Sequence, residues 1–438
     1  MSQYKAYTAY RDSGVKWIGQ IPEHWELMRL RHVARYSNSG VDKKSYEDQQ
    51  PVQLCNYTDV YYNEFISDDL PFMQSTASNQ EIEQFTLTQG DVIFTKDSED
   101  PTDIGIPAFV PYDMPGVVCG YHLTVVRALN GNSGSYIHRS IQSTHTKAHF
   151  FVESPGVTRY GLNQNTIGNT PVALPPPEEQ AAIATTLDRE TARIDALIQK
   201  KTRFIELLKE KREALITHAV TKGLDPKVKM KDSGVEWIGQ VPEHWEVKPF
   251  FALVTELKRK NTGLIETNIL SLSYGNIIQK PKSRNMGLTP ESYETYQIVE
   301  AGEMVFRFTD LQNDKRSLRS AQVTQRGIIT SAYLAVKPHG IDSTYFAWLM
   351  RSYDLCKVFY AMGGGLRQSL KFEDVKRLPI LIPSHEQQAN IANAIDVETA
   401  RIDTLVDKTK QSITLLKERR AAFITAAVTG QIDLRGKQ

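Results

Sequence analysis

Two stretches in the second half of the chain concentrate side chains that could recognise nucleic acid. They are FRFTDLQNDKRSLRSAQ (Phe306 to Gln322) and GGGLRQSLKFED (Gly363 to Asp374), which combine arginine, lysine, glutamine and serine. Arginine can bridge O6 and N7 of guanine, glutamine can bridge N6 and N7 of adenine, and lysine and serine can hold phosphates. These residue types therefore indicate hydrogen-bonded readout of DNA.

The first half of the chain has counterparts of these loops with fewer basic residues, around Lys96 and Arg159. Each residue alone is explained better by a solvated surface, but loops at matching places of two halves form a candidate interface. Tyrosines of the same segments complete the set. The candidate DNA-binding residues are Tyr57, Lys96, Asp97, Ser98, Tyr121, Arg159, Tyr160, Asn163, Gln164, Tyr274, Arg307, Lys315, Arg316, Arg319, Tyr333, Arg367, Gln368, Ser369 and Lys371.

Motifs for catalysis are not found in the sequence. There is no GxxxxGK[ST] phosphate loop and no GxSxG, and the glycines at 363–365 lack the flanking strand of a dinucleotide-binding fingerprint. His145 and His149 could ligate zinc, but no acidic or cysteine ligand is placed near them, so solvated histidines are favoured there and at His138. We expect no catalytic residue, no metal and no cofactor in this chain.

Length and composition suit a cytoplasmic protein of several domains. The chain has 438 residues, enough for two to four domains, and its three scattered cysteines form no disulfide framework. No apolar run approaches the roughly 20 residues needed to span a bilayer. Charge is uneven: residues 27–173 hold 10 lysines and arginines against 16 acids, a net −6, whereas residues 247–382 hold 19 against 12, a net +7. The second variable segment is therefore the more basic of the two.

The sequence contains two copies of a segment that predicts a long amphipathic helix. Residues 178–221 and 386–429 match at 26 of 44 positions at an offset of 208. Apolar residues recur about every seven positions in both copies, so each helix must bury one stripe on a partner, and the other copy is the obvious one. The residues expected at this interface, or at a contact between the helices and a partner, are Leu187, Ile194, Leu197, Leu208, Leu215, Ile395, Ile402, Leu405, Leu416 and Phe423.

Charged residues are also shared by the two helices. Glu190, Arg193 and Asp195 return as Glu398, Arg401 and Asp403. Contacts with a partner and salt bridges between the helices explain them equally well.

A second duplication defines the domain order. DSGVKWIGQIPEHWE (residues 12–26) returns as DSGVEWIGQVPEHWE (residues 232–246), with 13 of 15 residues identical, and we interpret each copy as a packed, tryptophan-rich turn. Between signature and helix lie variable segments of short strand-like runs and helices, which favours an α/β or α+β fold. The predicted order is a first recognition domain (1–173), a long helix (174–222), a linker with a second recognition domain (223–382), and a second long helix with a C-terminal tail (383–438).

The order of these motifs resembles the specificity subunit of type I restriction–modification systems. The signature WIG–x–[IV]–P–x–HW, a variable segment and P–x–x–EQ before a long helix each occur twice. The resemblance implies that each variable segment is a target recognition domain that reads one half of a bipartite, asymmetric DNA site. It also implies that the two helices form an antiparallel coiled coil that separates these domains.

The resemblance further implies partners that carry the chemistry. Two methyltransferase subunits would dock on the helices, and restriction subunits with nuclease and translocase activity would join them. S-adenosylmethionine, ATP and magnesium would belong to those partners, whose complex would methylate adenine and cut DNA. This chain would itself catalyse nothing.

Helix length fits a spacer between two reading domains. About 40 helical residues at ~1.5 Å each span roughly 60 Å, which leaves room for half-sites about one DNA turn, roughly 34 Å, apart. The alternative is a coiled-coil adaptor whose variable segments bind protein and do not read DNA. A self-contained methyltransferase or nuclease would need an NPPY-like motif or an acidic metal site, which we do not find.

Overall fold

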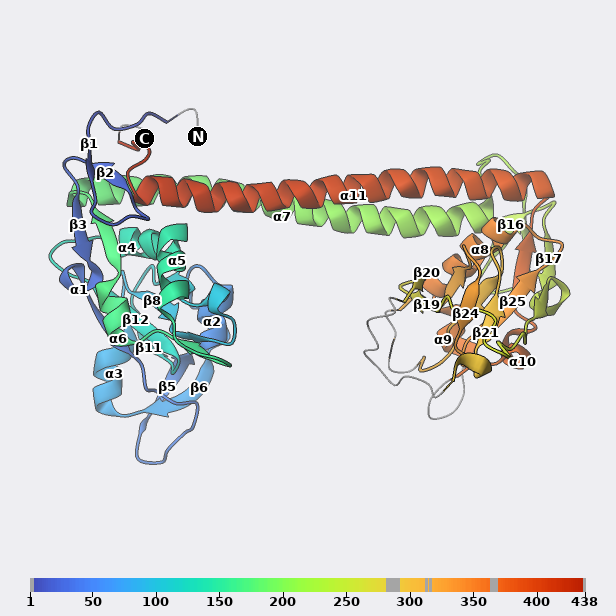
Figure 1. Ribbon diagram of the computed structural model, residues 1–438, viewed down its shortest axis with the longest axis horizontal. Helices are drawn as coiled ribbons and strands as arrows, with labels where there is room; N and C mark the ends of the chain where they lie inside the picture. The colour runs from blue at the N-terminus through green and yellow to red at the C-terminus, as the bar shows by residue number, and fades with distance from the viewer. Residues whose placement is uncertain (1–3, 281–291, 312–313, 315–316, 363–368, 436–438) are drawn as a thin grey trace. The chain divides into compact units, whose positions relative to one another are not determined.

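The computed structural model describes residues 4–280, 292–311, 314, 317–362 and 369–435 (Figure 1). The chain divides into two compact units: unit 1 is Met1–Lys201 with Gln411–Gln438, and unit 2 is Thr202–Lys410. These units differ from the predicted segments, because the division falls inside both long helices. The reason is packing, since each recognition domain shares its core with one end of each helix.

Unit 1 is built on two four-stranded sheets that pack face to face. In spatial order the first sheet is β10 (Pro107–Phe109), β8 (Val92–Thr95), β12 (Leu123–Ala128) and β4 (Ala34–Asn38), and the second is β6 (Met73–Ala77), β5 (Gln50–Cys55), β11 (Met114–Cys119) and β7 (Thr86–Leu87). Ile93 and Val125 face the core between the sheets, whereas Val92, Phe94 and Val126 face the helices. Successive side chains of a strand point to opposite faces, so a central strand buried on both faces is apolar throughout.

Short helices and small ribbons complete unit 1. The helices are α1 (Leu30–Val33), α2 (Tyr57–Tyr62), α3 (Asn79–Phe85), α4 (Gly134–Gln142), α5 (Thr144–Glu153), α6 (Gln164–Asn169) and the 3₁₀ turn η1 (Pro101–Asp103). The paired ribbons are β1 (Tyr10–Asp12) with β2 (Gln20–Pro22), β3 (Glu26–Arg29) with β14 (Pro171–Leu174), and β9 (Asp97–Ser98) with β13 (Tyr160–Gly161).

Unit 2 repeats the central sheet of unit 1. Its order is β23 (Ser320–Gln322), β22 (Met304–Phe306), β25 (Leu334–Pro338) and β18 (Val254–Glu256). Met304 and Phe306 face the helices while Val305 faces the smaller core, the same alternation as in β8. The two variable segments therefore share a scaffold, although their sequences differ.

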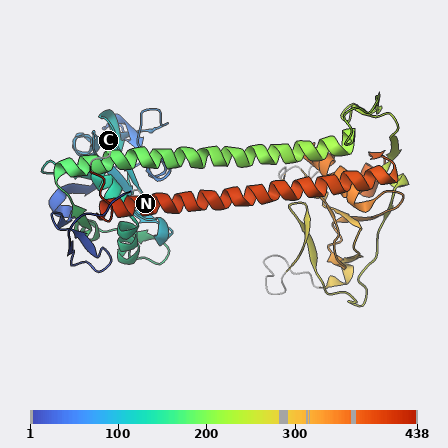
Figure 2. The same ribbon diagram turned by 90° about the horizontal axis from the view of Figure 1, so that it is seen from above.

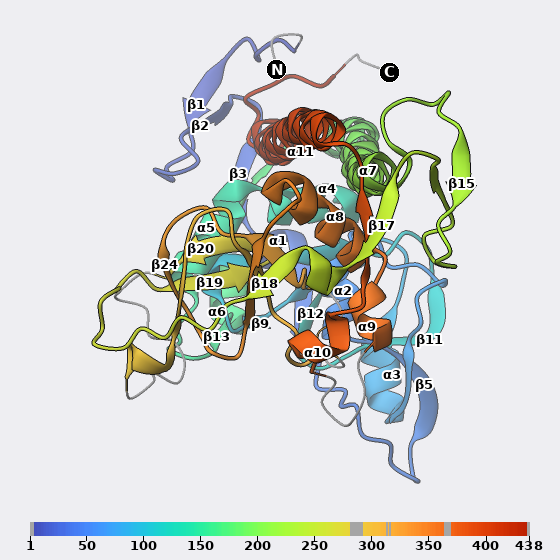
Figure 3. The ribbon, with the colours of Figure 1, turned by 90° about the vertical axis from the view of Figure 1, so that its right-hand side faces the viewer.

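The other elements of unit 2 surround this sheet. The ribbons are β15 (Met230–Asp232) with β16 (Gln240–Pro242), β17 (Glu246–Pro249) with β26 (Pro379–Ile382), β19 (Leu270–Ser273) with β20 (Asn276–Gln279), and β21 (Gln297–Val299) with β24 (Gly327–Ile329). The helices are α8 (Ser343–Leu355), α9 (Val358–Met362), α10 (Phe372–Val375) and the 3₁₀ turns η2 (Phe250–Ala252) and η3 (Tyr293–Thr295). Helix α8 lies beside the long helices (Figures 1 and 3).

The two long helices are α7 (Pro177–Lys222) and α11 (His385–Val428), within one residue of the predicted ends. In unit 1 the start of α7 packs with the end of α11, and in unit 2 the end of α7 packs with the start of α11 (Figure 2). The predicted antiparallel pairing is therefore seen within each unit. Among the described residues, no helix is long and apolar enough to cross a membrane.

Most of the predicted interface residues are buried, but two are not. Buried or half-buried side chains are Leu187, Ile194, Leu208, Leu215, Ile395, Ile402, Leu416 and Phe423. Leu197 is 43% exposed and Leu405 38% exposed, so this equivalent pair is not buried between the helices, and its contact with a partner stays a prediction. Two helices in contact cover only a narrow stripe, and apolar residues beside that stripe stay in solvent.

The shared charged residues divide between two roles. Asp195 pairs with Arg420 Nε at 3.0 Å, and Asp403 pairs with Arg212 Nε at 3.3 Å, so these aspartates join the helices at equivalent places. Arg401 pairs with Glu398 on its own helix at 3.7 Å. The aspartates are thus salt-bridge residues between helices.

The duplicated signature is a packing device, with more regular structure than predicted. In each copy two short strands pair, β1 with β2 and β15 with β16, where we expected an irregular turn. Trp25 and Trp245 follow these ribbons and are 0% and 1% exposed. Both insert into the core that holds the helix ends.

A buried tyrosine connects each recognition domain to both long helices. The hydroxyl of Tyr136 on α4 donates to the carbonyls of Ala173 at 2.6 Å and Val428 at 3.2 Å. The hydroxyl of Tyr345 on α8 donates to Leu381 at 3.1 Å and Val220 at 3.4 Å. In each unit one acceptor lies just before the start of one long helix, and the other lies at the end of the other long helix. The tyrosine therefore fixes both helices to the domain.

Removing either hydroxyl should loosen this attachment. We expect Tyr136→Phe and Tyr345→Phe each to lower the free energy of unfolding by about 1–3 kcal/mol, because two buried carbonyls lose their donor. Urea denaturation of the full chain measures the effect, with the exposed Tyr46→Phe as control. Equal stability of all three variants would contradict the assigned role.

Candidate nucleic-acid interface

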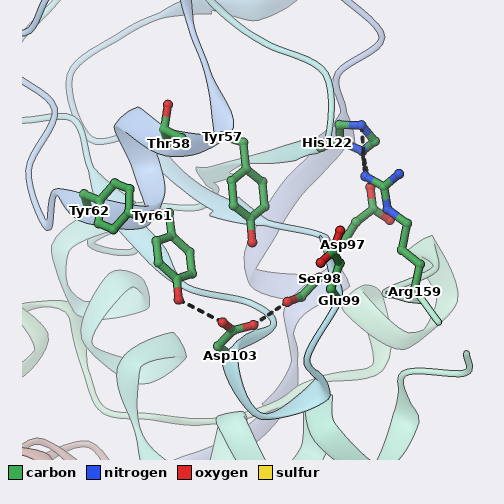
Figure 4. A pocket seen from close by; sticks show the side chains of 10 residues that line it. All are labelled: Tyr57, Thr58, Tyr61, Tyr62, Asp97, Ser98, Glu99, Asp103, His122 and Arg159. Carbon is green, nitrogen blue, oxygen red and sulfur yellow. Dashed lines mark hydrogen bonds and ion pairs between the residues drawn. The ribbon is translucent and has the colours of Figure 1, made fainter. Parts of the chain in front are cut away.

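Many predicted residues of unit 1 meet at one surface pocket (Figure 4). Its volume is about 400 Å³, and α2, the loops around β9 and η1, the β11–β12 turn and the loop before β13 contribute to it. The lining residues are Tyr57, Thr58, Tyr61, Tyr62, Asp97, Ser98, Glu99, Asp103, His122 and Arg159. Lys96 and Tyr121 adjoin it through their contacts with Asp97 and His122.

Helix α2 supplies an aromatic wall to the pocket. The chain turns into this helix at Asn56, whose backbone N–H donates to Asp59 Oδ2 at 2.7 Å in the manner of a capping residue. Tyr57 and Tyr61 are one helical turn apart and stack at 5.6 Å between ring centroids. Tyr62 is 76% exposed, so an aromatic face is open to solvent beside the stacked pair.

The opposite wall is a cluster of charges around Asp97. Its Oδ2 accepts hydrogen bonds from His122 Nδ1 at 2.6 Å and from Lys96 Nζ at 3.0 Å. Arg159 NH2 lies 3.1 Å from the His122 ring, and Lys96 Nζ lies 5.2 Å from the centre of the Tyr121 ring. His122 has a φ of 72°, a left-handed conformation that turns its ring toward the aspartate.

Three groups that line the pocket have shifted pKa values, and burial raises the pKa of one of them, Tyr57. Burial alone would raise the pKa of Asp97, but hydrogen bonds from His122 and Lys96 outweigh it, and the pKa lies below its usual value. The hydrogen bond from Tyr61 to Asp103 raises the pKa of Tyr61 to about 12. At neutral pH the wall therefore holds a carboxylate that accepts and a phenol that donates.

This arrangement suits recognition of a nucleic acid. Arg159 and Lys96 can contact phosphate or guanine, a carboxylate such as Asp97 can accept from an exposed base amine, and tyrosines can stack on bases. Among the described residues, no group of three or more histidine, cysteine or acidic side chains is arranged to hold a metal ion.

Unit 2 places its candidate loop against the equivalent strand. The backbone N–H of Leu162 donates to Lys96 O at 2.8 Å in unit 1, and that of Leu370 donates to Phe308 O at 3.0 Å in unit 2. The exposed Ser369 and Lys371 flank Leu370, and the half-buried Arg307 precedes Phe308. The structure therefore brings these loops to matching positions of the two units.

The other candidate residues that the structure describes do not line the pocket of unit 1, and several of them have structural roles. Tyr274 is 77% exposed at the β19–β20 turn, whereas Tyr333 is half-buried against the small core of unit 2. Asn163 accepts from Thr166 N–H at 2.8 Å as the cap of α6, and the exposed Gln164 follows it. Tyr160 pairs with Ser98 between β13 and β9. Lys315, Arg316, Arg367 and Gln368 lie outside the described residues.

The prediction for Arg319 was wrong. Its side chain is 0% exposed, and its guanidinium donates to the carbonyls of Thr309 at 3.1 Å and Asp310 at 3.4 Å and to the Tyr360 hydroxyl at 3.2 Å. A buried arginine must satisfy its donors inside the protein, and here it holds the loop after β22 in place. Basic residues surround Arg319 along the chain, so its burial could not be predicted from its neighbours.

The expectation of solvated histidines was also wrong for His138. It is 1% exposed and packs on Phe65 and Phe109, and burial lowers its pKa to about 3. His145 and His149 pack on Trp17 at 6.0 and 5.8 Å between ring centroids. All three histidines take part in packing.

The sequence did not single out Tyr61, Tyr62, Asp103 or His122. Residues 52–60 form a strand-like run in the sequence, but β5 ends at Cys55 and α2 begins at Tyr57. The three tyrosines of YTDVYY (residues 57–62), at i, i+4 and i+5, were the available signal for an aromatic helix face. Asp103 and His122 are separated from Asp97 by loops whose path only the fold determines.

The structure consists of two related units, each with a candidate nucleic-acid surface at an equivalent place. Residues 22–207 match the family model of the type I restriction modification DNA specificity domain. A curated relative, the putative type I restriction enzyme MjaX specificity subunit of Methanocaldococcus jannaschii, is 21% identical over 428 residues. That match covers 95% of this chain and 96% of the relative.

Solved structures share the fold over nearly the whole chain. One, from work on complex assembly and conformational transition of the type I R-M system, has a TM-score of 0.67 and 14% identity, covering 95% of this chain and 99% of its own. The HsdS subunit of Thermoanaerobacter tengcongensis has a TM-score of 0.54 and 15% identity, covering 94% and 98%. The resemblance found in the sequence is thus confirmed: residues 22–207 match the DNA specificity domain of type I restriction–modification systems, and nearly the whole chain is similar to a specificity subunit of such a system.

Two arginines of unit 2 should behave differently when truncated. Arg307→Ala should leave folding intact and reduce the slope of DNA affinity against salt concentration by about one, the loss expected for one phosphate contact. Arg319→Ala should instead destabilise the chain by about 2–4 kcal/mol, because a buried hydrogen-bond hub is removed. Urea unfolding and salt titrations of DNA binding separate these outcomes, and an unchanged stability of Arg319→Ala would contradict its structural role.

Asp97 should influence base preference in one half-site. We expect Asp97→Asn to change the preferred base at one position of that half-site, by about 1–3 kcal/mol, because an acceptor becomes partly a donor. Binding to a randomised DNA library measures this. Asp48→Asn, an exposed residue outside the pocket with the same charge change, serves as control. If both variants prefer the same DNA motif as the unsubstituted protein, Asp97 does not contact a base.

Proposed function

We propose that each unit reads one half of a bipartite, asymmetric DNA site. The observation that carries the proposal is the repeated scaffold with unlike loops. Both units keep the strand order of the central sheet and the hydrogen bond that positions the candidate loop. Unit 1 offers carboxylates and tyrosines there, whereas Arg307, Ser369 and Lys371 occupy the same region of unit 2. Different groups on equivalent surfaces would read different bases.

The proposal assigns the long helices a spacer role. Helices α7 and α11 have 46 and 44 residues and continue without interruption from one unit to the other. A helix rises ~1.5 Å per residue, so its length would set the distance between half-sites. The number of unread base pairs would then depend on the helix length.

The same helices would receive two methyltransferase subunits. Leu197 and Leu405 occupy equivalent positions and are 43% and 38% exposed, and Leu207 and Leu415, also equivalent, are 46% and 64% exposed. Apolar residues open at duplicated places suit two copies of one partner. Adenine methylation with S-adenosylmethionine, and restriction with ATP and magnesium, would be carried out by methyltransferase and restriction subunits in the cytoplasm.

Methylation mapping tests the proposed function directly. Cells would receive the cognate methyltransferase subunit with or without this chain, and single-molecule sequencing would locate methylated adenines. We expect a gapped, asymmetric motif that depends on the chain. A folded complex that produces no new methylation would overturn the proposal.

The spacer role makes a separate prediction. Inserting the same seven residues after Thr202 and after Lys410, which are equivalent positions, should lengthen both helices by about 10.5 Å and preserve the heptad pattern. At ~3.4 Å per base pair the gap in the motif should grow by about three base pairs. Methylation mapping measures the gap, and an unchanged gap in an active complex would exclude the spacer role.

A further inference from the structure

In unit 1 a tyrosine from the N-terminal segment fills a cavity beside the first signature. Tyr7 is 5% exposed, and its hydroxyl donates to Glu179 Oε1 at 2.5 Å. Its ring lies 5.7 Å from the rings of both His24 and Trp25. Trp25 Nε1 donates to the same Glu179 oxygen at 3.2 Å, so each polar group at this site is satisfied.

In unit 2 the equivalent place is a cavity of about 250 Å³. His244, Trp245 and Gln387 line it and stand where the first copy has His24, Trp25 and Glu179. Gln387 Oε1 contacts His244 Nε2 at 2.9 Å. Trp245 is 1% exposed, and its Nε1 has no hydrogen-bond partner. An unpaired buried donor is costly, and in this cavity no group accepts from the indole N–H of Trp245.

The chain itself explains why the cavity stays open. In unit 1 two segments share the site, because the N-terminal residues meet the C-terminal tail at the Lys5–Asp433 bridge, where Arg435 covers Tyr7 (termini in Figure 1). In unit 2 a single linker from Gly223 to Met230 takes the place of both the N-terminal segment and the C-terminal tail. Lys227 takes the register of Tyr7, and it is exposed. The linker thus brings no aromatic side chain to the cavity.

We propose that this cavity, named here the Trp245 pocket, receives a tyrosine side chain from the methyltransferase subunit. The inference rests on the proposed function for the identity of that partner. A phenol oxygen would accept from Trp245 Nε1, and its O–H would donate to Gln387 Oε1, the atom that replaces the Glu179 carboxylate. An apolar cavity of about 150 Å³ can hold benzene, so the Trp245 pocket has room for a phenol ring.

The surroundings of the pocket support a protein partner. Leu224, Asp225, His244 and Asn390 form an exposed rim, so the pocket is reachable from solvent. Val397 lies two helical turns from Asn390 on α11 and is 58% exposed, which extends the apolar surface along the helix. Equivalent pockets are filled in unit 1 and open in unit 2, so only one of two methyltransferase copies would use this contact.

The first experiment detects occupancy of the pocket with 4-methylphenol, the side-chain analogue of tyrosine. The full chain with ¹⁵N-labelled tryptophan has five indole N–H groups to follow by NMR. We expect the Trp245 signal to shift on titration while the Trp25 signal stays fixed. Tyr7→Ala should open the first cavity and make the Trp25 signal respond too. No shift of Trp245, or equal shifts of all five signals, would overturn the inference.

The second experiment fills the Trp245 pocket with a side chain from the chain's own linker. Lys227→Tyr places a tyrosine at the register of Tyr7 and should abolish the response to 4-methylphenol, while Lys227→Ala should preserve it. Lys227→Tyr should also weaken assembly with the cognate methyltransferase subunit by about tenfold, a typical loss for a buried anchor. Unchanged assembly would overturn the docking. DNA binding of the same variants, which should not change, tests the proposed function separately.

Discussion

The attachment of each recognition domain to both long helices is the constraint on which the rest of the structure depends. One buried tyrosine, Tyr136 or Tyr345, hydrogen-bonds the carbonyls that precede one helix and end the other. Buried glutamines reinforce it: Gln180 accepts from Ser133 N–H at 2.8 Å, and Gln388 accepts from Asp342 N–H at 2.7 Å. These bonds are buried or partly buried, where broken polar contacts are costly, so each domain is held to both helix ends.

Around this attachment the two units have diverged while keeping its geometry. Arg139 in unit 1 donates to Asp188 at 2.6 Å, whereas Trp348 in the equivalent place of unit 2 donates from Nε1 to Asp396 at 2.8 Å. An arginine and a tryptophan thus meet equivalent aspartates of α7 and α11. Arg139 and Arg420 also pair with Glu64. Burial alone would raise the pKa of Glu64, but the two arginines lower it, so unit 1 gains an ionic link that ties the loop after α2 to both long helices.

The reading surfaces are built on the side of the scaffold that this packing leaves open. The strand ends after β8 and β22 fix the candidate loops through one backbone hydrogen bond each. Beyond that bond the side chains are free to differ, so the same fold can present Asp97 and His122 in one unit and Arg307 and Lys371 in the other. Specificity therefore changes without disturbing the attachment to the helices.

The sequence alone determined the features that repeat along the chain: the limits of both long helices, the signature tryptophans, the paired variable domains and the family that they resemble. Those features depend on local periodicity and on duplication, which are visible without a structure. It did not determine which polar side chains face solvent. Arg319 and Lys371 look alike in a basic loop, yet the first is buried among carbonyls, and Leu197 keeps the helix period but lies beside the stripe. Nor could it bring His122 and Asp103 to Asp97. Such contacts depend on chain paths between distant segments, and only tertiary packing decides them.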